Sequence, residues 1–316
     1  MPPHPVPKNR TGSIANCKHF QFNLTLRSID SVKMMATPNS AGSSAPDGTP
    51  PVRGGVAAIV HRLTLMAGFL TLSVAALFAE PPTASAPLTN SPAYFTALAE
   101  RAYQTARGRW LADTNRAEAA WQFGRACFDR AEFAVSDAQR AALGSEGASV
   151  CRPLVARPPK LAAAHYYLAM NLGQVARTKS VGALPIVSEM ELLFKTAAGL
   201  EAGFDFAGSD RCLGLLYRDA PVWPASIGNR VKARQHLTHA AELAPQFPEN
   251  HLNLLETFLQ WNEPNNARRE WKALADCLPF ARTNFTGPAW AANWADWDQR
   301  RAAVEPRLRE TPRPSR

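Results

Sequence analysis

The same helical pattern occurs twice between residues 233 and 279, with an offset of 34 residues. Each copy has a small residue, a bulky one four positions later, a small or apolar one three later and a proline five later. The two sets are Ala233, Leu237, Ala240 and Pro245, followed by Ala267, Trp271, Leu274 and Pro279. Positions four and three apart share one face of an α-helix, so they pack together against a neighbouring helix. Proline has no N–H to donate and is expected to end each helix. This period predicts helix–turn–helix units that stack to bury their apolar faces.

Less regular copies of the pattern extend upstream. Gly147, Cys151, Leu154 and Pro159 keep the same spacing, and an insertion separates them from the preceding helix. A further pair is expected from about residue 162 to 203, and another begins near residue 210 and is interrupted by a proline-rich turn before about residue 229. Gly214 is expected to let the paired helix approach closely. The sequence therefore predicts an all-α helical-repeat solenoid over residues 91–303, with about four helix pairs.

Two single helices complete this prediction. Ser91 and Pro92 are typical of an N-cap followed by the first helical residue, and they predict an N-terminal helix to about Leu111. A C-terminal capping helix is expected over about 287–301, with three tryptophans on the face that packs against the core. They are Trp290, Trp294 and Trp297. Residues 304–316 are rich in proline and arginine and are expected to form a flexible tail.

The N-terminal part of the chain has a different composition. Residues 1–52 are rich in Pro, Ser, Asn and Gly and predict a disordered leader. Translation is expected to start within or after it, at Met34, Met35 or later. Residues 53–79 combine basic residues with 17 uncharged, largely apolar residues from 63 to 79. This layout favours a signal peptide, with a membrane anchor or a buried helix as alternatives. Residues 80–90 are expected to form a linker. The protein is thus expected to be exported to the periplasm, or anchored facing it.

The net charge of +9 at first suggests an anionic partner, but the charge is unevenly distributed. Residues 1–79 hold seven basic and two acidic residues, which leaves a net charge of +4 for the rest. No basic helix with interleaved aromatic residues is found, so nucleic-acid binding is not expected. Membrane contact is expected only through the N-terminal apolar segment.

The repeats resemble tetratricopeptide (TPR) units. The spacing described above is similar to that of the second TPR helix, and Leu213, Gly214 and Tyr217 approximate the Leu-Gly pattern of the first helix, shortened by one residue. A narrower resemblance, carried by residues 165–173 and 210–228, is to the TPR-like T component of tripartite ATP-independent periplasmic (TRAP) transporters. That resemblance implies an exported helical protein that docks a periplasmic solute-binding subunit. The lipid-modified Cys usual in that family has no counterpart after the apolar segment.

No pattern of residues indicates catalysis. There is no phosphate-binding loop, nucleophile elbow or zinc-protease motif. His236 and His239 lie three apart, which is half of a metal site, but no third ligand stands at an indicative spacing. Cys127, Cys151, Cys212 and Cys277 are expected to be buried as small apolar residues, with two disulfides as the alternative. We therefore expect a non-enzymatic protein with no cofactor and no metal.

A TPR-like solenoid binds through the concave surface lined by its first helices. The register places nine candidates there: Trp121, Arg125, Tyr166, Met170, Gln174, Arg211, Leu215, Glu256 and Gln260. Arg125 and Arg211 are suited to receive a carboxylate, although Arg211 has the alternative of pairing with Asp210 or Asp219. The Lys/Asn clamp of chaperone-binding TPR domains is absent.

Trp223 stands between two prolines in the interrupting turn, where it packs on the next helix pair or presents its ring to a partner. We expect a protein-interaction scaffold that acts through the concave groove. The alternative is an accessory protein of a periplasmic transporter that docks a solute-binding subunit or holds a small ligand. An enzyme with an unrecognised site is the third interpretation.

Overall fold

The computed structural model describes residues 91–158, 160–179 and 182–310, which belong to one compact unit. The predicted leader, apolar segment and linker lie outside the described residues, as do the last six residues of the tail. None of the helices in the described part is long and apolar enough to cross a membrane.

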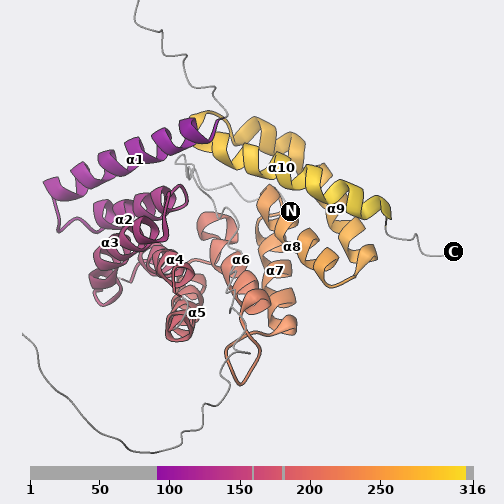
Figure 1. Cartoon of the computed structure of the whole chain (residues 1–316), viewed down its shortest axis with the longest axis horizontal. Helices are drawn as coiled ribbons and strands as arrows, with labels where there is room; N and C mark the ends of the chain where they lie inside the picture. Colours follow the sequence, from indigo (N-terminus) through magenta and orange to yellow (C-terminus); the bar gives the residue numbers. More distant parts are fainter. Residues whose placement is uncertain (1–90, 159, 180–181, 311–316) are drawn as a thin grey trace, which may run out of the picture. The chain divides into compact units, whose positions relative to one another are not determined.

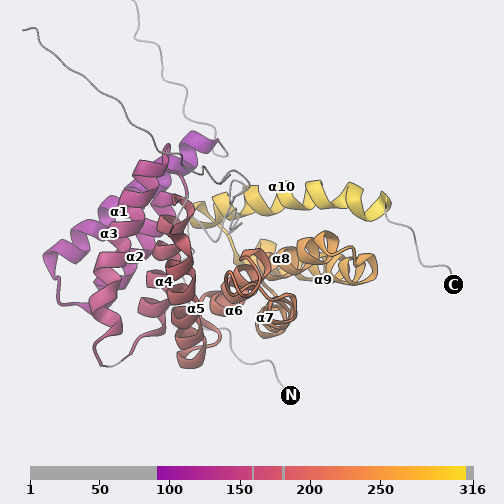
Figure 2. The same ribbon diagram turned by 60° about the horizontal axis from the view of Figure 1, so that its bottom comes forward.

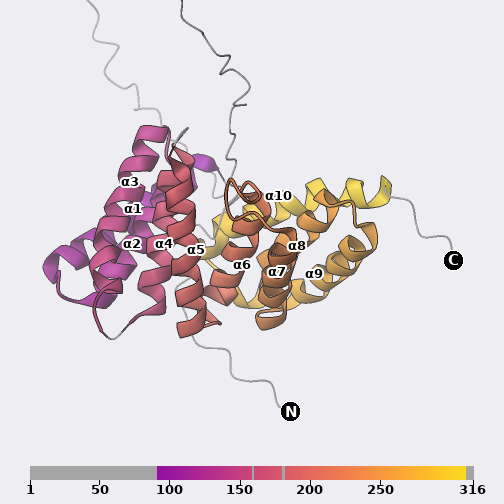
Figure 3. The same ribbon diagram turned by 90° about the horizontal axis from the view of Figure 1, so that it is seen from below.

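The described residues form ten helices and no regular strand, which confirms the all-α prediction (Figure 1). They are α1 (Pro92–Ala112), α2 (Ala117–Ala131), α3 (Asp137–Val155), α4 (Ala162–Arg177), α5 (Ala183–Leu200), α6 (Phe204–Asp219), α7 (Arg230–Leu243), α8 (Pro248–Gln260), α9 (Pro264–Asn284) and α10 (Pro288–Glu310). Consecutive helices pack against one another, and α2, α4, α6 and α8 also contact each other in that order (Figure 2). This is the contact pattern of stacked helix pairs. The last helix, α10, lies against α8 and α9 (Figure 3).

Side-chain caps set the starts of three helices, and the first of these caps is the predicted Ser91. The hydroxyl oxygen of Ser91 accepts a hydrogen bond from the N–H of Tyr94 at 3.1 Å, and α1 then begins with proline. Ser136 caps α3 in the same way, and Asn229 caps α7 by accepting from the N–H of Lys232 at 2.9 Å. Each cap satisfies one of the N–H groups that the first helical turn leaves without a partner.

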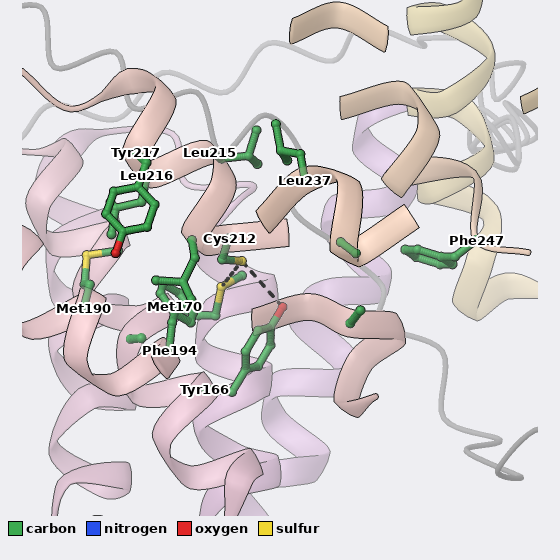
Figure 4. Close-up of a cluster of buried hydrophobic side chains, with 14 of the residues drawn as sticks. Tyr166, Met170, Met190, Phe194, Cys212, Leu215, Leu216, Tyr217, Leu237 and Phe247 are labelled. Carbon is green, nitrogen blue, oxygen red and sulfur yellow. Dashed lines mark hydrogen bonds between the residues drawn. The ribbon is translucent and has the colours of Figure 1, made fainter. Parts of the chain in front are cut away.

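The repeat positions lie in the core. Ala233, Leu237 and Ala240 on α7, and Ala267 and Leu274 on α9, are all buried, whereas Trp271 is only partly buried. The main cluster continues through the sulfur and aromatic side chains between α4, α5 and α6. There the thiol of Cys212 lies 3.6 Å from the sulfur of Met170 (Figure 4).

The four cysteines of the repeats are free, buried thiols, as the first alternative predicted. Burial raises the pKa of Cys151 to about 12 and that of Cys277 to about 11. The apolar surroundings disfavour the thiolate.

Gly214 on α6 lies directly against Leu237 on α7. A Cβ atom at this position would be 2.5 Å from Cγ of Leu237 and 3.0 Å from its backbone nitrogen, so a side chain would push the helices apart. We expect Gly214→Ala to lower the free energy of unfolding by about 1–3 kcal/mol, as overpacked cores do. Urea denaturation measures this change.

Gly108 on α1 provides the matched control, because a Cβ atom added there would have no other atom within 4 Å. At that position the same substitution is expected to stabilise the helix by up to about 1 kcal/mol. Equal effects of the two substitutions would show that the contact between α6 and α7 is not tight.

Pro279 does not end its helix as predicted, and the last helix continues through Pro306, which was predicted to lie in the tail. Pro279 lies inside α9, and Pro306 lies inside α10, which continues to Glu310. Proline removes one helical hydrogen bond. The apolar face of α9 nevertheless continues past it, since Cys277 and Ala281 are buried on either side. Packing of that face outweighs the lost bond. In α10, Val304 is buried, so the helix extends beyond the predicted boundary at residue 303.

The tryptophans of α10 face the core, as predicted. Trp290 and Trp297 are buried, and Trp294 is partly buried and donates from its indole nitrogen to the carbonyl of Phe285 at 2.6 Å. These aromatic rings fix the first half of α10 to the rest of the fold.

Candidate functional site: a pocket bounded by α1, α6, α8 and α10

Most of the residues predicted to line a groove lie in the interior. Five of the nine are at most 3% exposed: Tyr166, Met170, Gln174, Arg211 and Leu215. Trp121 stacks on Tyr167 with 5.9 Å between ring centroids, and Arg125 pairs with Asp129 at 3.7 Å. The first helices of the four pairs are α2, α4, α6 and α8, and they pack against one another. Because of these contacts, most of the side chains predicted to line the groove are buried. Of the nine candidates, Glu256 and Gln260 line the pocket of the described residues that is presented below.

A left-handed turn at the start of α6 accounts for much of this burial. Asp205, Phe206 and Ala207 have φ between 50° and 61°, a region that side chains other than glycine rarely adopt. The carboxylate of Asp205 accepts a hydrogen bond from the Tyr166 hydroxyl at 2.7 Å. The turn thus closes over the tyrosine that the repeat register placed in the groove.

Arg211 stabilises this turn. Its guanidinium donates to the carbonyl oxygens of Asp205 and Phe206 at 3.2 and 3.1 Å, and to the Asp205 carboxylate at 3.0 Å. It also donates to the side-chain oxygen of Asn250 on α8 at 3.0 Å. The internal pairing considered above therefore exists, but its acid is Asp205 and not Asp210 or Asp219.

A pocket of about 810 Å³ lies between α1, the turn after α2, α6, α8 and α10. This volume falls within the range of small-molecule binding sites. Its lining residues are Pro92, Phe95, Phe133, Arg218, Glu256, Gln260, Ala295, Asp296, Gln299, Arg300, Ala303, Val304 and Arg307. Helix α10 supplies more than half of them.

Arg300 links α10 to α8 at the base of this pocket. It donates two hydrogen bonds of 2.8 Å to the carboxylate of Glu256 and one of 2.6 Å to the side-chain oxygen of Asn253. Burial opposes the charged form of Arg300, but attraction to Glu256 and Asp296 outweighs it, and the pKa of Arg300 is raised. Arg300 thus stays charged and holds α10 in place.

The other polar groups of the pocket fall into two classes. Arg218 is paired with Asp219 through bonds of 2.6 and 2.8 Å and also donates to Thr257. Gln260, Gln299 and Arg307 line the pocket without a hydrogen-bond or ion-pair partner in the described part of the chain. One cation and two amides are therefore available to a bound molecule, beside the apolar surface of Phe133 and Ala303.

The spacing of residues along α10 holds a signal for this pocket that the repeat register does not include. Asp296, Arg300, Val304 and Arg307 are spaced four, four and three apart, so they share one face of a helix. This spacing places all four residues on the face of α10 that lines the pocket. Ending the helix near residue 301 hid it, because Val304 and Arg307 then fell in the tail.

The predicted histidine pair meets a carboxylate. Nδ1 of His236 lies 2.7 Å from one oxygen of Asp210, and Nδ1 of His239 lies 3.1 Å from the other. Both rings use this nitrogen to tie α7 to α6. No group of three or more His, Cys, Asp or Glu residues in the described ranges is arranged to hold a metal ion.

Trp223, the residue predicted for a contact in the loop, does not line this pocket. Trp223 follows α6 and is 82% exposed, so its ring is presented outward and does not pack over the next helix pair.

Comparison with known proteins adds no family to these observations. No protein-family model matches the chain, and no curated protein sequence does.

Proposed function

We propose that this chain is an exported, TPR-like helical-repeat protein that binds a segment of a partner protein in the pocket between α1, α6, α8 and α10. The pocket is the observation that carries the proposal. In this proposal the pocket replaces the concave groove that the repeat spacing predicts. Two of the nine predicted groove residues, Glu256 and Gln260, line the pocket.

The lining chemistry suits an extended peptide. Gln260 and Gln299 each offer a donor and an acceptor to a peptide backbone, and Arg307 offers a charged donor to a carboxylate. Phe133 and Ala303 provide an apolar surface for a side chain. The bidentate contact between Arg300 and Glu256 fixes the helix that carries most of these groups, so the pocket is formed before a ligand arrives.

Filling the pocket tests this proposal. Ala303 lines it and Ala302 does not, although both are exposed on the same turn of α10. Peptides selected from a displayed random library on the wild-type protein are expected to bind Ala302→Trp equally well. We expect Ala303→Trp to weaken them at least about tenfold, because the new ring occupies the space of the ligand. Fluorescence anisotropy measures the affinities. Failure to select any peptide, or equal binding by both variants, would overturn the proposal.

A second candidate is favoured by the pocket volume, which also suits a small ligand. The protein would then act as a T-component-like accessory of a periplasmic transporter that holds a solute. A thermal-shift screen with small carboxylates distinguishes the two. A compound that stabilises the wild type and Ala302→Trp, but not Ala303→Trp, supports the ligand-holding role.

A further inference from the structure

The loop between α6 and α7 extends beyond the ends of both helices (Figure 1). Trp223 at its tip is 82% exposed, and the adjacent Val222 is 71% exposed. Val231, in the first turn of α7, is 65% exposed. Large apolar side chains at such exposure lose the free energy that burial would supply. Two large exposed apolar side chains on one projecting loop, with a third in the first turn of the helix that follows, indicate a surface that contacts something outside this chain.

The loop is braced at its base. The N–H of Gly228 donates to the carbonyl of Pro221 at 2.8 Å, and the N–H of Asn229 donates to the carbonyl of Tyr217 at 2.8 Å. A Cβ atom at Gly228 would lie 2.1 Å from the carbonyl oxygen of Ala220, so the two sides of the loop approach as closely as glycine permits. Ile227 packs against the core. The tip therefore projects from a fixed support.

Positive charge predominates around this support. Nζ of Lys232 lies 5.1 Å from the centroid of the Tyr217 ring, and the Tyr217 hydroxyl donates to Glu191. The basic side chains around the base are Lys195, Arg230, Lys232 and Arg234, against the acidic Glu191 and Glu263. Arg218 and Asp219, which precede the loop, neutralise each other. Two positive charges therefore remain in excess beside an apolar tip.

We infer that this tip rests on an anionic phospholipid surface. Tryptophan beside aliphatic side chains, with basic residues behind them, is the combination that settles at the boundary between headgroups and acyl chains. A neutral apolar pocket in another protein would gain nothing from the surrounding basic residues, whereas anionic headgroups would. The inference is independent of the pocket proposed above. It also differs from the sequence-based expectation that only the N-terminal apolar segment contacts a membrane.

Quenching of tryptophan fluorescence by lipids with brominated acyl chains tests the contact at the ring itself. The full-length protein is mixed with vesicles of phosphatidylglycerol and phosphatidylcholine. We expect strong quenching of the wild type and clearly weaker quenching of Trp223→Phe. Trp110→Phe, the same substitution in α1, is expected to be quenched like the wild type, because Trp110 stacks on Phe123 away from the loop. The comparison holds whether or not residues 63–79 also insert, because the variants differ at one ring.

The role of charge is tested with the same proteins. On vesicles of phosphatidylcholine alone, the quenching due to Trp223 is expected to fall at least about fivefold, since each basic residue near an anionic surface contributes about 1 kcal/mol. High salt is expected to lower it in the same way. Equal quenching of the wild type and Trp223→Phe would overturn the inference and favour a protein-docking tip. If the quenching due to Trp223 is equally strong on anionic vesicles and on vesicles of phosphatidylcholine alone, an anionic surface is not the partner.

Discussion

Replacing Arg211 with methionine is expected to lower the free energy of unfolding by about 3–5 kcal/mol, the cost of removing one partner from a buried charge pair. Methionine fills a similar volume but donates no hydrogen bond. The Asp205 carboxylate and the Asp205 carbonyl would lose the donor that now lies 3.0–3.2 Å away. The left-handed turn would also lose its main support, and three residues with positive φ are costly to maintain without one. Urea denaturation measures the loss.

Arg152 provides the control, because it forms an ion pair with Glu189 on the surface and its side chain is 53% exposed. Solvent weakens such pairs, so Arg152→Met is expected to change stability little. Arg211→Lys separates charge from geometry: a lysine keeps the charge but lacks the planar fork that meets several acceptors at once. We expect it to recover less than half of the loss. A wild-type stability for Arg211→Met would show that the turn does not depend on this network.

The second large effect concerns Glu249, whose replacement by glutamine is expected to stabilise the protein in alkaline solution. The side chain is fully buried in α8, and neither carboxylate oxygen has a hydrogen-bond partner among the described residues. Burial raises the pKa of Glu249 from 4.5 to about 7, against the attraction of Arg211 and Arg300. The folded state therefore holds a proton that the unfolded state releases.

The direction of the pH effect follows from this raised pKa. Between pH 4.5 and about 7 the folded protein binds more protons at Glu249 than the unfolded chain does, so stability falls as the pH rises through this window. The full loss is about 3 kcal/mol above the window. We expect Glu249→Gln to match the wild type near pH 4.5 and to exceed its free energy of unfolding by about that amount above pH 7. Urea denaturation across this pH range measures both curves.

Glu118→Gln removes the same charge from an exposed position on α2 and serves as the control. Its pH curve is expected to follow that of the wild type. Parallel curves for wild type and Glu249→Gln would mean that water or a hydrogen bond reaches the buried carboxylate.

The helices were predictable because their signals are local. Ala233 and Leu237 predict a buried face from spacing alone, and Ser136 and Asn229 cap helices through a group three residues away. The left-handed turn was not predictable, because none of its three residues with positive φ is a glycine. It depends on Arg211, which reaches back to Asp205 and across to Asn250, 39 residues further along the chain.

The pocket was missed for a related reason. The repeat spacing identified Glu256 and Gln260 on α8. The pocket wall that faces them is formed by α10, and no local sequence pattern shows that α10 packs against α8. Its position depends on the contact between Arg300 and Glu256, 44 residues apart. Arg307 lies beyond the predicted helix end near residue 301, in the part of α10 that the sequence pattern assigns to the tail. Spacing within a helix identifies the face that is buried, whereas the route of a neighbouring helix depends on contacts that spacing does not encode.

The distribution of the four buried thiols gives the molecule a set of internal reporters. Cys127 lies on α2, Cys151 on α3, Cys212 on α6 and Cys277 on α9, so the cysteines sample three different helix pairs. A thiol reagent reaches each one only when the surrounding helices separate. In a stack of repeats, each unit contacts mainly its neighbours, and the ends can open before the middle. The order in which these sulfurs become labelled therefore records how opening spreads along the stack.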